Sequence, residues 1–314
     1  MSDKFDIIIV GAGPAGCCCA LMLANTGLKL AIIDKSSFPR DKICGDALSF
    51  AVLNNLKKLP QGIFDRFLNE FNSKLPSYGV RFVSPSSEIL DIDFNSPANS
   101  SYAPGYISKR EDFDFFLFKE LKNYPNINII QNCRINDVTY SESINLITET
   151  NLYSAKIVVA ADGANSIIRK KLSGNIIDKN RQCTGIKAYF KGVSGFREGN
   201  FIELHFLKDI LPGYFWIFPL PNGMANVGLG MLNKDIHKNK TILKKQFTSI
   251  ISSNTLIAPR FINSELIGNY QADYLPLGTK KYNISGERFL LTGDAACLTD
   301  PFTGEGVANA MFSG

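Results

Sequence analysis

The sequence predicts an α/β protein, α+β overall, in which a β-rich layer is inserted into a domain of alternating strands and helices. Two observations support this prediction. Short apolar runs typical of strands buried on both faces end in glycine or aspartate, as in "DIIIVG", "SAKIVVAADG" and "GERFLLTGD". Between these runs, from about residue 175 to 283, alternating strands with aromatic side chains replace the first pattern, as in "GIKAYFKGV" and "YFWIFPL".

The first apolar run, residues 5–10, leads into a glycine-rich turn. Gly11 allows the turn, Gly13 lets a pyrophosphate approach the backbone, and Gly16 lets the following helix pack against the strand. The helix is predicted from Pro14 to Thr26, and phosphates would face its positive end. This arrangement favours a cradle for a dinucleotide over a glycine turn without a ligand.

A second strand, residues 28–33, ends at Asp34, where an acid would hold a ribose hydroxyl. A lone glycine motif is weak evidence, but here the strand, the helix, the second strand and the acid all occur in order. The residues assigned to this part of the cofactor site are Gly11, Gly13, Pro14, Ala15, Gly16, Asp34 and Lys35.

Composition limits the classes of function. The 314 residues carry a net charge of +5 without a concentrated basic block, so we expect no nucleic-acid partner, while weak attraction to anionic membrane surfaces stays open. Two histidines and seven cysteines without a paired CxxC spacing predict no metal site. Free thiols suit a reducing, cytoplasmic location. We expect neither a signal peptide nor a membrane span.

Three segments then occur in order: "GAGPAG" (11–16), "ADGANSIIR" (161–169) and "LTGDAACLTDPFTGEG" (291–306). Together they resemble the FAD-binding motifs of the flavoprotein hydroxylase fold, which aromatic hydroxylases, flavin halogenases and geranylgeranyl reductases share. The resemblance implies a Rossmann-like FAD-binding domain with an inserted antiparallel β-sheet substrate domain, similar to para-hydroxybenzoate hydroxylase.

The resemblance also implies roles for individual residues. Asp294 would accept a hydrogen bond from a ribitol hydroxyl, while Gly304 and Gly306 would open the last helix so that the flavin lies against the backbone. Arg110 matches the family arginine that begins a helix before a Phe-Asp pair and contacts FAD. The second and third motifs contribute the cofactor-binding residues Asp162, Gly163, Gly293, Asp294, Pro301, Gly304, Glu305 and Gly306.

The segment "YFWIFPLPNGMANVGLG" (214–230) distinguishes the branches of this fold. It resembles the geranylgeranyl reductase signature YxWxFP followed by GxG, which in that family lines a prenyl cavity beside the flavin. Alternation along a strand would place three of its aromatic rings on one face. The substrate residues implied are Tyr214, Trp216, Phe218, Pro219, Gly228 and Gly230. An aromatic strand in an ordinary core is the alternative interpretation.

The segment "RDKICGDALS" (40–49) supports the same branch, whose members often carry a Cys-Gly pair here. Arg40 and Lys42 could meet phosphate charge, and Gly45 joins the cofactor residues. Cys44 would lie near the start of the helix expected after Asp46, where a helix N-terminus lowers a thiol pKa. Cys44 is therefore a candidate for cofactor contact and for catalysis, with packing as the alternative.

The resemblance implies an FAD-dependent oxidoreductase of lipid metabolism that saturates isoprenoid double bonds by hydride transfer from reduced flavin. Cys44, Tyr214 and Trp216 are the candidate catalytic residues, and FAD is expected to be noncovalent. NAD(P)H as a transient reductant, or a reduced protein, would supply electrons, because only one dinucleotide fingerprint occurs. The alternatives are an aromatic hydroxylase or monooxygenase, a flavin halogenase-like enzyme, and an inactive or incomplete flavin-binding module.

The predicted organisation is discontinuous. Residues 1–75, 101–174 and 284–314 are assigned to the FAD-binding domain, and residues 76–100 and 175–283 to the substrate domain. Helices are expected at 47–58 and 62–71, and a further helix is expected to have Ser108 as its N-cap and Glu111 three residues later. The chain stops at Gly314 within a predicted helix, so we expect a C-terminally truncated protein.

Overall fold

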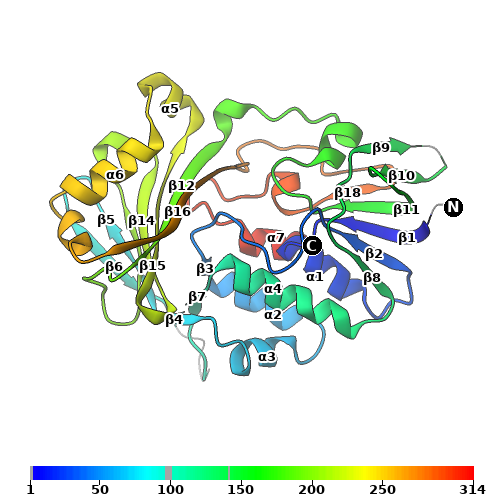
Figure 1. Cartoon of the computed structure of the whole chain (residues 1–314), viewed down its shortest axis with the longest axis horizontal. Helices are drawn as coiled ribbons and strands as arrows, with labels where there is room; N and C mark the ends of the chain where they lie inside the picture. Colours follow the sequence, from blue (N-terminus) through cyan, green and yellow to red (C-terminus); the bar gives the residue numbers. More distant parts are fainter. Residues whose placement is uncertain (1–2, 96–100, 141) are drawn as a thin grey trace.

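The computed structural model describes residues 3–95, 101–140 and 142–314, and it has two lobes, each built on a large sheet (Figure 1). A mainly parallel sheet forms the lobe at the right, and an antiparallel sheet forms the lobe at the left. The structure confirms the predicted α/β class with an inserted β-rich sheet.

The first sheet has the order β17-β18-β11-β1-β2-β8, with β10 pairing to β11 and β9 to β10. The pairs β18–β11, β11–β1, β1–β2 and β2–β8 are parallel. The strands are β1 (Asp3–Val10), β2 (Leu30–Ile33), β8 (Ile127–Ile130), β9 (Asp137–Tyr140), β10 (Ile144–Ile147), β11 (Leu152–Ala160), β17 (Ser285–Gly286) and β18 (Phe289–Leu291). Helices cover one face of this sheet, and a second buried cluster that includes Ile8, Val10 and Ile168 covers the other. Burial on both faces explains why the central strands are apolar throughout.

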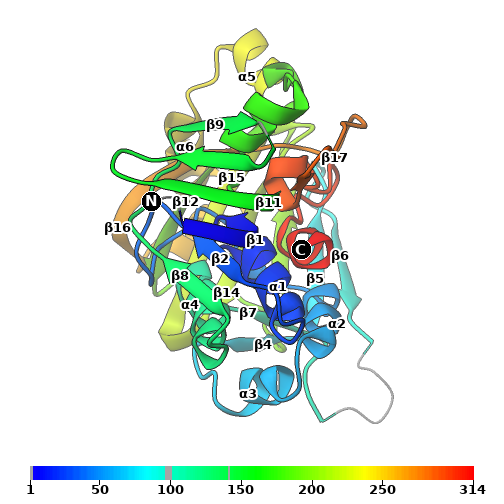
Figure 2. The same cartoon turned by 90° about the vertical axis from the view of Figure 1, so that its right-hand side faces the viewer.

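The helices that contact this face share a large core in which rings of α3 and α4 meet edge to face. Figure 2 shows α1 and α7 packed side by side against the parallel strands. The helices are α1 (Pro14–Leu23), α2 (Phe50–Lys58), α3 (Ile63–Asn69), α4 (Arg110–Glu120) and α7 (Val307–Ser313). Cys17, Cys18 and Cys19 are buried within α1, where they pack as small apolar residues.

The second sheet has the order β16-β12-β15-β14-β13-β5-β6. Its strands come from two parts of the chain: β5 (Gly79–Val83), β6 (Ile89–Asp93), β12 (Cys183–Lys191), β13 (Ile202–His205), β14 (Tyr214–Leu220), β15 (Met224–Leu232) and β16 (Glu265–Leu275). Every pair is antiparallel except β13–β5, which is parallel because the two strands enter from different parts of the chain. The expected inserted antiparallel sheet is therefore confirmed, with β13–β5 as its one parallel pair among the described strands.

The two faces of the second sheet have different neighbours. Phe215 and Ile217 of β14 pack with residues of α6 (Leu243–Ser253), and a short helix α5 (Asn233–Asn239) lies nearby. Trp216 and Phe218 face the other way and pack with Ile107, toward the first lobe. The alternation predicted for Tyr214, Trp216 and Phe218 is confirmed.

A small sheet, β3-β7-β4, lies at the junction of the lobes, formed by β3 (Ala47–Leu48), β4 (Leu75–Ser77) and β7 (Gly105–Ile107). The helix expected at 47–58 is wrong at its start, because residues 47–48 pair with β7 and α2 begins only at Phe50. Similarly, α1 ends at Leu23, before Thr26, and the helix expected at 62–71 spans Ile63–Asn69.

The expected cap of α4 is also wrong. The N-cap residue is Lys109, and Ser108 does not cap the helix, since its hydroxyl donates to the carbonyl of Lys109. Instead, the Oδ1 atom of Asp46, distant in sequence, accepts a hydrogen bond of 3.2 Å from the backbone N–H of Arg110. A side chain from the loop 40–46 thus satisfies one of the unpaired donors at the start of the helix.

Across the described ranges 3–95, 101–140 and 142–314, no helix is long and apolar enough to cross a membrane. Within the same ranges, no cluster of three or more His, Cys, Asp or Glu side chains has the arrangement of a metal site.

Candidate FAD and substrate site

The glycine turn after β1 has the close contacts that its residues predict. Gly11 has φ +100°, and a Cβ there would lie 2.2 Å from the carbonyl oxygen of Ala161. A Cβ at Gly16 would lie 1.8 Å from the oxygen of Gly11, so both positions exclude a side chain. Gly13 differs, because the terminal nitrogen of Arg40, at 3.3 Å, is the only described atom within 4 Å of its ideal Cβ. A side chain at Gly13 would therefore meet the flexible end of Arg40 and no backbone, so a ligand can approach the turn here.

Asp34, at the end of β2, holds this turn in place. Its Oδ2 accepts a hydrogen bond of 2.8 Å from the backbone N–H of Ala12, and its Oδ1 accepts one of 2.8 Å from Ser36. A carboxylate has about four acceptor positions, so each oxygen can still accept from a ribose hydroxyl. The neighbouring Lys35 is exposed.

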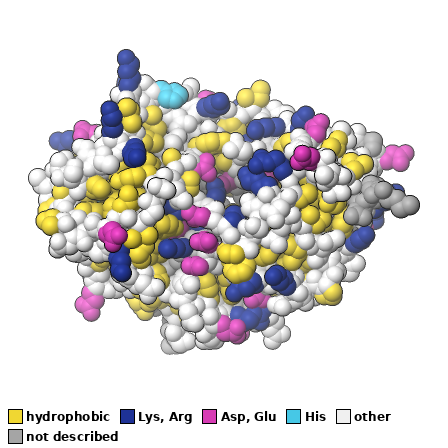
Figure 3. All heavy atoms as spheres, viewed as in Figure 1, with side chains coloured by type: hydrophobic (Ala, Val, Ile, Leu, Met, Phe, Trp, Pro, Cys, Tyr) yellow, Lys and Arg dark blue, Asp and Glu magenta, His cyan; other side chains and the backbone are white. Residues whose placement is uncertain are grey.

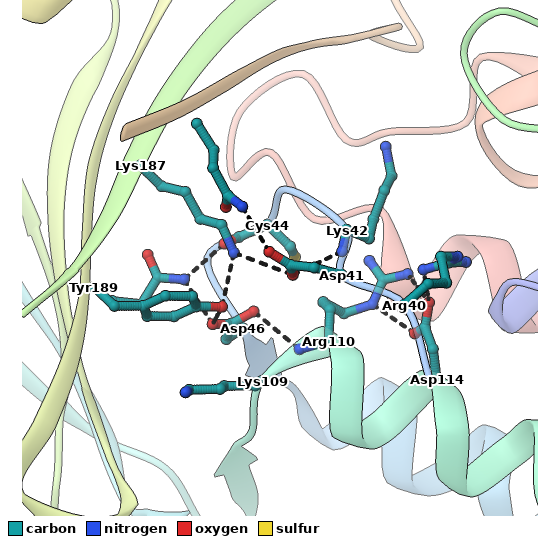
Figure 4. A network of polar contacts seen from close by, with 12 residues as sticks. Arg40, Asp41, Lys42, Cys44, Asp46, Lys109, Arg110, Asp114, Lys187 and Tyr189 are labelled. Atoms are coloured by element: carbon teal, nitrogen blue, oxygen red, sulfur yellow. Dashed lines mark hydrogen bonds and ion pairs between the residues drawn. The ribbon is translucent and has the colours of Figure 1, made fainter. Parts of the chain in front are cut away.

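Two arginines beside the turn share one buried carboxylate. Asp114 of α4 accepts a bond of 2.8 Å from Arg40 and bonds of 2.7 and 2.9 Å from Arg110 (Figure 4). Burial opposes the charge of Arg110, but the charge of Asp114 outweighs it, and the pKa of the guanidinium is raised. Two cations against one anion leave a net positive charge next to Gly13, which suits a pyrophosphate.

The second and third motifs meet at the carboxyl ends of β11 and β18. Asp162 accepts a hydrogen bond of 2.8 Å from the backbone of Ile167, and burial raises the pKa of its carboxyl. Gly163, with φ +78°, has open space at its Cβ position. Arg169 donates to the carbonyl oxygens of Asp294 and Ala295, so it joins the two motifs.

The third motif presents its residues toward the second lobe. Asp294 lies 3.8 Å from the Nζ of Lys42 and accepts from Thr299, while Gly293, with φ +55°, makes the turn after β18. Pro301 is exposed, the carboxylate of Glu305 accepts from the hydroxyl of Ser49, and Gly306 is the N-cap of α7. As predicted, the glycines open the last helix.

The aromatic strand contacts these FAD motifs directly. The hydroxyl of Tyr214 donates to the carbonyl oxygen of Thr303 at 2.5 Å, and a Cβ on Gly304 would lie 2.9 Å from that hydroxyl. A Cβ on Gly45 would lie 2.9 Å from the ring of Phe218. The Cys-Gly pair, the last glycine motif and the aromatic strand therefore meet at one place.

The glycines of the GxG pair seat the indole of Trp216. Gly228 lies opposite Trp216 in the sheet, and a Cβ on it would lie 2.1 Å from the ring. Gly230 lies opposite Tyr214, and a Cβ there would also face the ring, at 3.9 Å. The ring lies across β15 because these side chains are missing. Pro219, the residue before the last of β14, is buried.

A buried polar network joins the lobes behind this aromatic face (Figure 4). The fully buried Asp46, with φ +72°, accepts at Oδ2 from the hydroxyl of Tyr189 at 2.8 Å and from the amide of Asn226 at 2.7 Å. Lys187, also fully buried, donates to Tyr189 at 2.7 Å and lies 3.6 Å from Asp41. Burial raises the pKa of Asp46, partly offset by Lys187.

The placement of Cys44 differs from the prediction. Because β3 intervenes, Cys44 is not at the start of α2, and it contacts the guanidinium of Arg110 at the start of α4 instead. Its thiol is partly buried at the junction of the lobes. Lysine, arginine and acidic side chains gather between the lobes on the face shown in Figure 3.

Sequence reasoning missed several members of this site: Asp41, Asp46, Asp114, Lys187, Tyr189 and Asn226. One signal was available for Lys187, because a lysine interrupts the otherwise apolar strand "GIKAYF". In the sheet this lysine lies opposite Gly228. Asp114 forms an (i, i+4) pair with Arg110. Asp46, 64 residues before Arg110, gave no local signal.

Two family models match the chain. Residues 6–66 match an FAD binding domain, and residues 184–263 match the geranylgeranyl reductase catalytic domain, which contains the aromatic strand and the GxG pair. A menaquinone reductase of Mycobacterium tuberculosis is 26% identical across 100% of this chain and 76% of its own length. A digeranylgeranylglycerophospholipid reductase of Methanococcoides burtonii is 28% identical, across 100% of this chain and 73% of its own.

The chain is an FAD-dependent oxidoreductase similar to the geranylgeranyl reductases.

Solved structures show the same fold as this reductase. A geranylgeranyl bacteriochlorophyll reductase-like protein from Thermoplasma acidophilum superposes with a TM-score of 0.79 at 23% identity, covering 99% of this chain and 76% of its own. A flavin-dependent brominase reaches 0.80 at 20% identity, covering 98% of this chain and 76% of its own.

The residues of this reductase fit FAD. Gly13 provides open backbone, Arg40 and Arg110 provide net positive charge, and Asp34 provides free acceptor positions. These groups lie together at the carboxyl ends of the parallel strands, where ligands of open α/β sheets bind.

We predict that the FAD is noncovalent. No histidine lies in the three FAD motifs, and Cys44 interacts with Arg110. Acid precipitation of the purified flavoprotein should therefore leave all flavin absorbance in the supernatant. Flavin that stays with the precipitate, or a protein that takes up no FAD, would contradict this prediction.

We expect Gly13→Val to abolish FAD binding, because the side chain would occupy the open space at the turn. Few atoms surround that position, so the apoprotein should unfold at nearly the wild-type temperature. FAD titration followed by fluorescence and thermal unfolding measures both effects. Wild-type FAD affinity in this variant would argue against the cradle.

We expect Asp34→Ala to weaken FAD binding by roughly 1.5–3 kcal/mol, the range for a hydrogen bond to a charged group. The loss includes the disorder of the turn, because Ala12 and Ser36 lose their acceptor. Asp34→Asn is the matched control, since one acceptor oxygen remains. Its FAD affinity should lie between those of the wild type and Asp34→Ala. Equal affinities for all three proteins would exclude a role for this carboxylate.

Proposed function

We propose that this reductase saturates carbon–carbon double bonds of an isoprenoid lipid. The observation that carries the proposal is the contact between the aromatic face and the FAD motifs, at Phe218–Gly45 and Tyr214–Thr303. An apolar prenyl chain needs an aromatic surface more than charged anchors. The names of the relatives support the same class, since menaquinone and digeranylgeranylglycerophospholipid both carry isoprenoid chains.

The aromatic residues orient the chain and keep water away from it. Trp216 is 9% exposed and Phe218 is 7% exposed, and both pack in one cluster with Leu204 and Leu220. Alkene saturation requires a hydride and a proton, and reduced FAD supplies the hydride when bound. The protein supplies position, exclusion of water and the proton.

Cys44 and Tyr214 are the two proton donors that we consider. The hydroxyl proton of Tyr214 is engaged by the carbonyl of Thr303, and burial raises the pKa of this phenol. The thiol of Cys44 lies at the junction of the lobes beside Arg110. We therefore assign proton donation to the Sγ of Cys44 and substrate positioning to Tyr214 and Trp216.

We also propose that electrons come from outside the chain. NAD(P)H or a reduced protein would reach the flavin transiently, since the sequence has one dinucleotide fingerprint. The substrate class further suggests peripheral contact with a membrane, and free cysteines suit a reducing cytoplasm.

The test is anaerobic reduction of the purified flavoprotein, followed by addition of prenyl diphosphates, prenylated lipids or oxygen. Reoxidation by a prenyl substrate, with two hydrogens added to the product, supports the proposal. Rapid reaction with oxygen and hydroxylation of a ring would instead indicate a monooxygenase, and halide incorporation a halogenase. Full FAD occupancy without turnover of any of these would indicate an inactive flavin-binding module.

We expect Trp216→Ala to lower turnover of long prenyl substrates by about 10- to 100-fold, because the chain loses its orienting surface. FAD affinity should stay close to wild type, since the indole contacts β15 rather than the glycine turn. Trp216→Phe, which keeps an aromatic ring, is the control and should retain more activity. Parallel losses of FAD binding and turnover in the alanine variant would contradict a substrate role.

A further inference from the structure

Asn226 is buried where the two candidate catalytic elements meet. It lies on β15 with no solvent exposure, in register with Phe218 of the neighbouring strand. Its Oδ1 accepts a hydrogen bond of 2.8 Å from the indole N–H of Trp216. Its Nδ2 donates to the carbonyl oxygen of Cys44 and to the Oδ2 of Asp46, both at 2.7 Å.

The partners determine which way this amide points. An indole N–H can only donate, and a carbonyl oxygen can only accept. The Asn226 oxygen must therefore face Trp216, and its nitrogen must face Cys44 and Asp46. Reversing the amide would break all three hydrogen bonds, so a single orientation is defined by chemistry.

The hydrogen bond to the amide gives the indole of Trp216 a defined direction. The missing side chains at Gly228 and Gly230 make space for the ring, but space alone does not fix the rotation of the indole. The hydrogen bond from the indole does. A buried donor left without its acceptor costs free energy, so the ring has a strong preference for this rotamer.

The same amide holds the loop that carries Cys44. This loop contacts the second lobe through the ring of Phe218, and Asp46 at its end has a left-handed backbone. Asn226 bonds the loop at two points, the carbonyl of Cys44 and the side chain of Asp46. The loop therefore takes its position relative to the substrate sheet from β15.

We propose that Asn226 is a positioning residue of this reductase, which fixes the ring of Trp216 and the loop of Cys44 relative to each other. The proposal rests on the proposed function for the roles of Trp216 and Cys44. A single amide between the two lobes keeps the substrate side and the FAD side of the site in register, and loosening either bond loosens the other.

The experiment uses the FAD-loaded protein and the variant Asn226→Ala. Trp216 is the chain's single tryptophan, so quenching of tryptophan emission by acrylamide reports on this ring alone. Alkylation by iodoacetamide, followed by peptide mass spectrometry, reports on Cys44, with the partly buried Cys133 as internal control. We expect quenching of Trp216 and alkylation of Cys44 both to rise several-fold, with Cys133 unchanged.

Turnover gives the third measurement. We expect kcat with a prenyl substrate to fall by about 10- to 100-fold, as for a misplaced reacting group. In a double-mutant cycle with Trp216→Phe, the two losses should be less than multiplicative, because both variants break the same hydrogen bond. Multiplicative losses would overturn the coupling.

Tyr189→Phe is the matched control. It removes a different donor to Asp46 and leaves both bonds between Asn226, Trp216 and Cys44 intact, so quenching of Trp216 should stay at the wild-type level. If Asn226→Ala fails to fold, Asn226→Asp and Trp216→Phe replace it. Asn226→Asp retains an acceptor for the indole but not the donors, so Cys44 alkylation should rise more than Trp216 quenching.

Unchanged quenching and unchanged alkylation in the Asn226 variants would overturn the proposal. Trp216→Phe should likewise raise Cys44 alkylation, because the amide joins the indole of Trp216 to the backbone of Cys44. Wild-type alkylation in that variant would also count against the proposal. A wild-type protein that reduces no prenyl substrate contradicts the proposed function instead. The spectroscopic and alkylation measurements still decide the positioning role in that case.

Discussion

The arrangement of the two lobes depends on the burial of one carboxylate, that of Asp46. Isolated in a protein interior, an ionised carboxylate costs far more than folding can supply, so it must be hydrogen-bonded and paired. Here the donors come from three elements: the N-terminus of α4, Tyr189 on β12 and Asn226 on β15. The buried ammonium of Lys187 supplies the opposite charge. The need of the Asp46 carboxylate for these hydrogen bonds and for a counter-charge thus sets the position of the first lobe relative to the second.

A second buried carboxylate, Asp114, has the complementary task on the FAD side. It holds Arg40 and Arg110 together where their mutual repulsion would otherwise separate them. Because Asp114 neutralises only one of the two cations, it both stabilises the pair and leaves charge for an anionic ligand. Asp46 and Asp114, on opposite sides of the start of α4, therefore position the charged side chains of the site.

The fold and the glycine turns could be predicted because their signals are local. Buried runs, a glycine spacing and alternation along β14 depend on residues that are neighbours in sequence. The polar network could not be predicted from the sequence, because tertiary structure alone brings its residues together: Asp46, Arg110, Lys187 and Asn226. The wrong cap shows the same limit: Ser108 has a residue type that caps helices, yet it lies one residue before the N-cap, and a distant carboxylate bonds the helix N-terminus. The family pattern implied that Gly228 and Gly230 bind substrate. In the structure, the absence of side chains at these glycines makes room for the indole of Trp216.

The parallel pair β13–β5 has a consequence for synthesis of the chain. Val80 lies beside Ile202, although more than a hundred positions of sequence separate them. The ribosome releases β5 and β6 long before the remaining strands of their sheet exist, so this hairpin must wait without β13 while most of the first lobe is made. Such long-range closures are slow and leave sheet edges exposed. The lobe that carries the aromatic face therefore completes its folding late, because its sheet closes only when β13 has paired with β5.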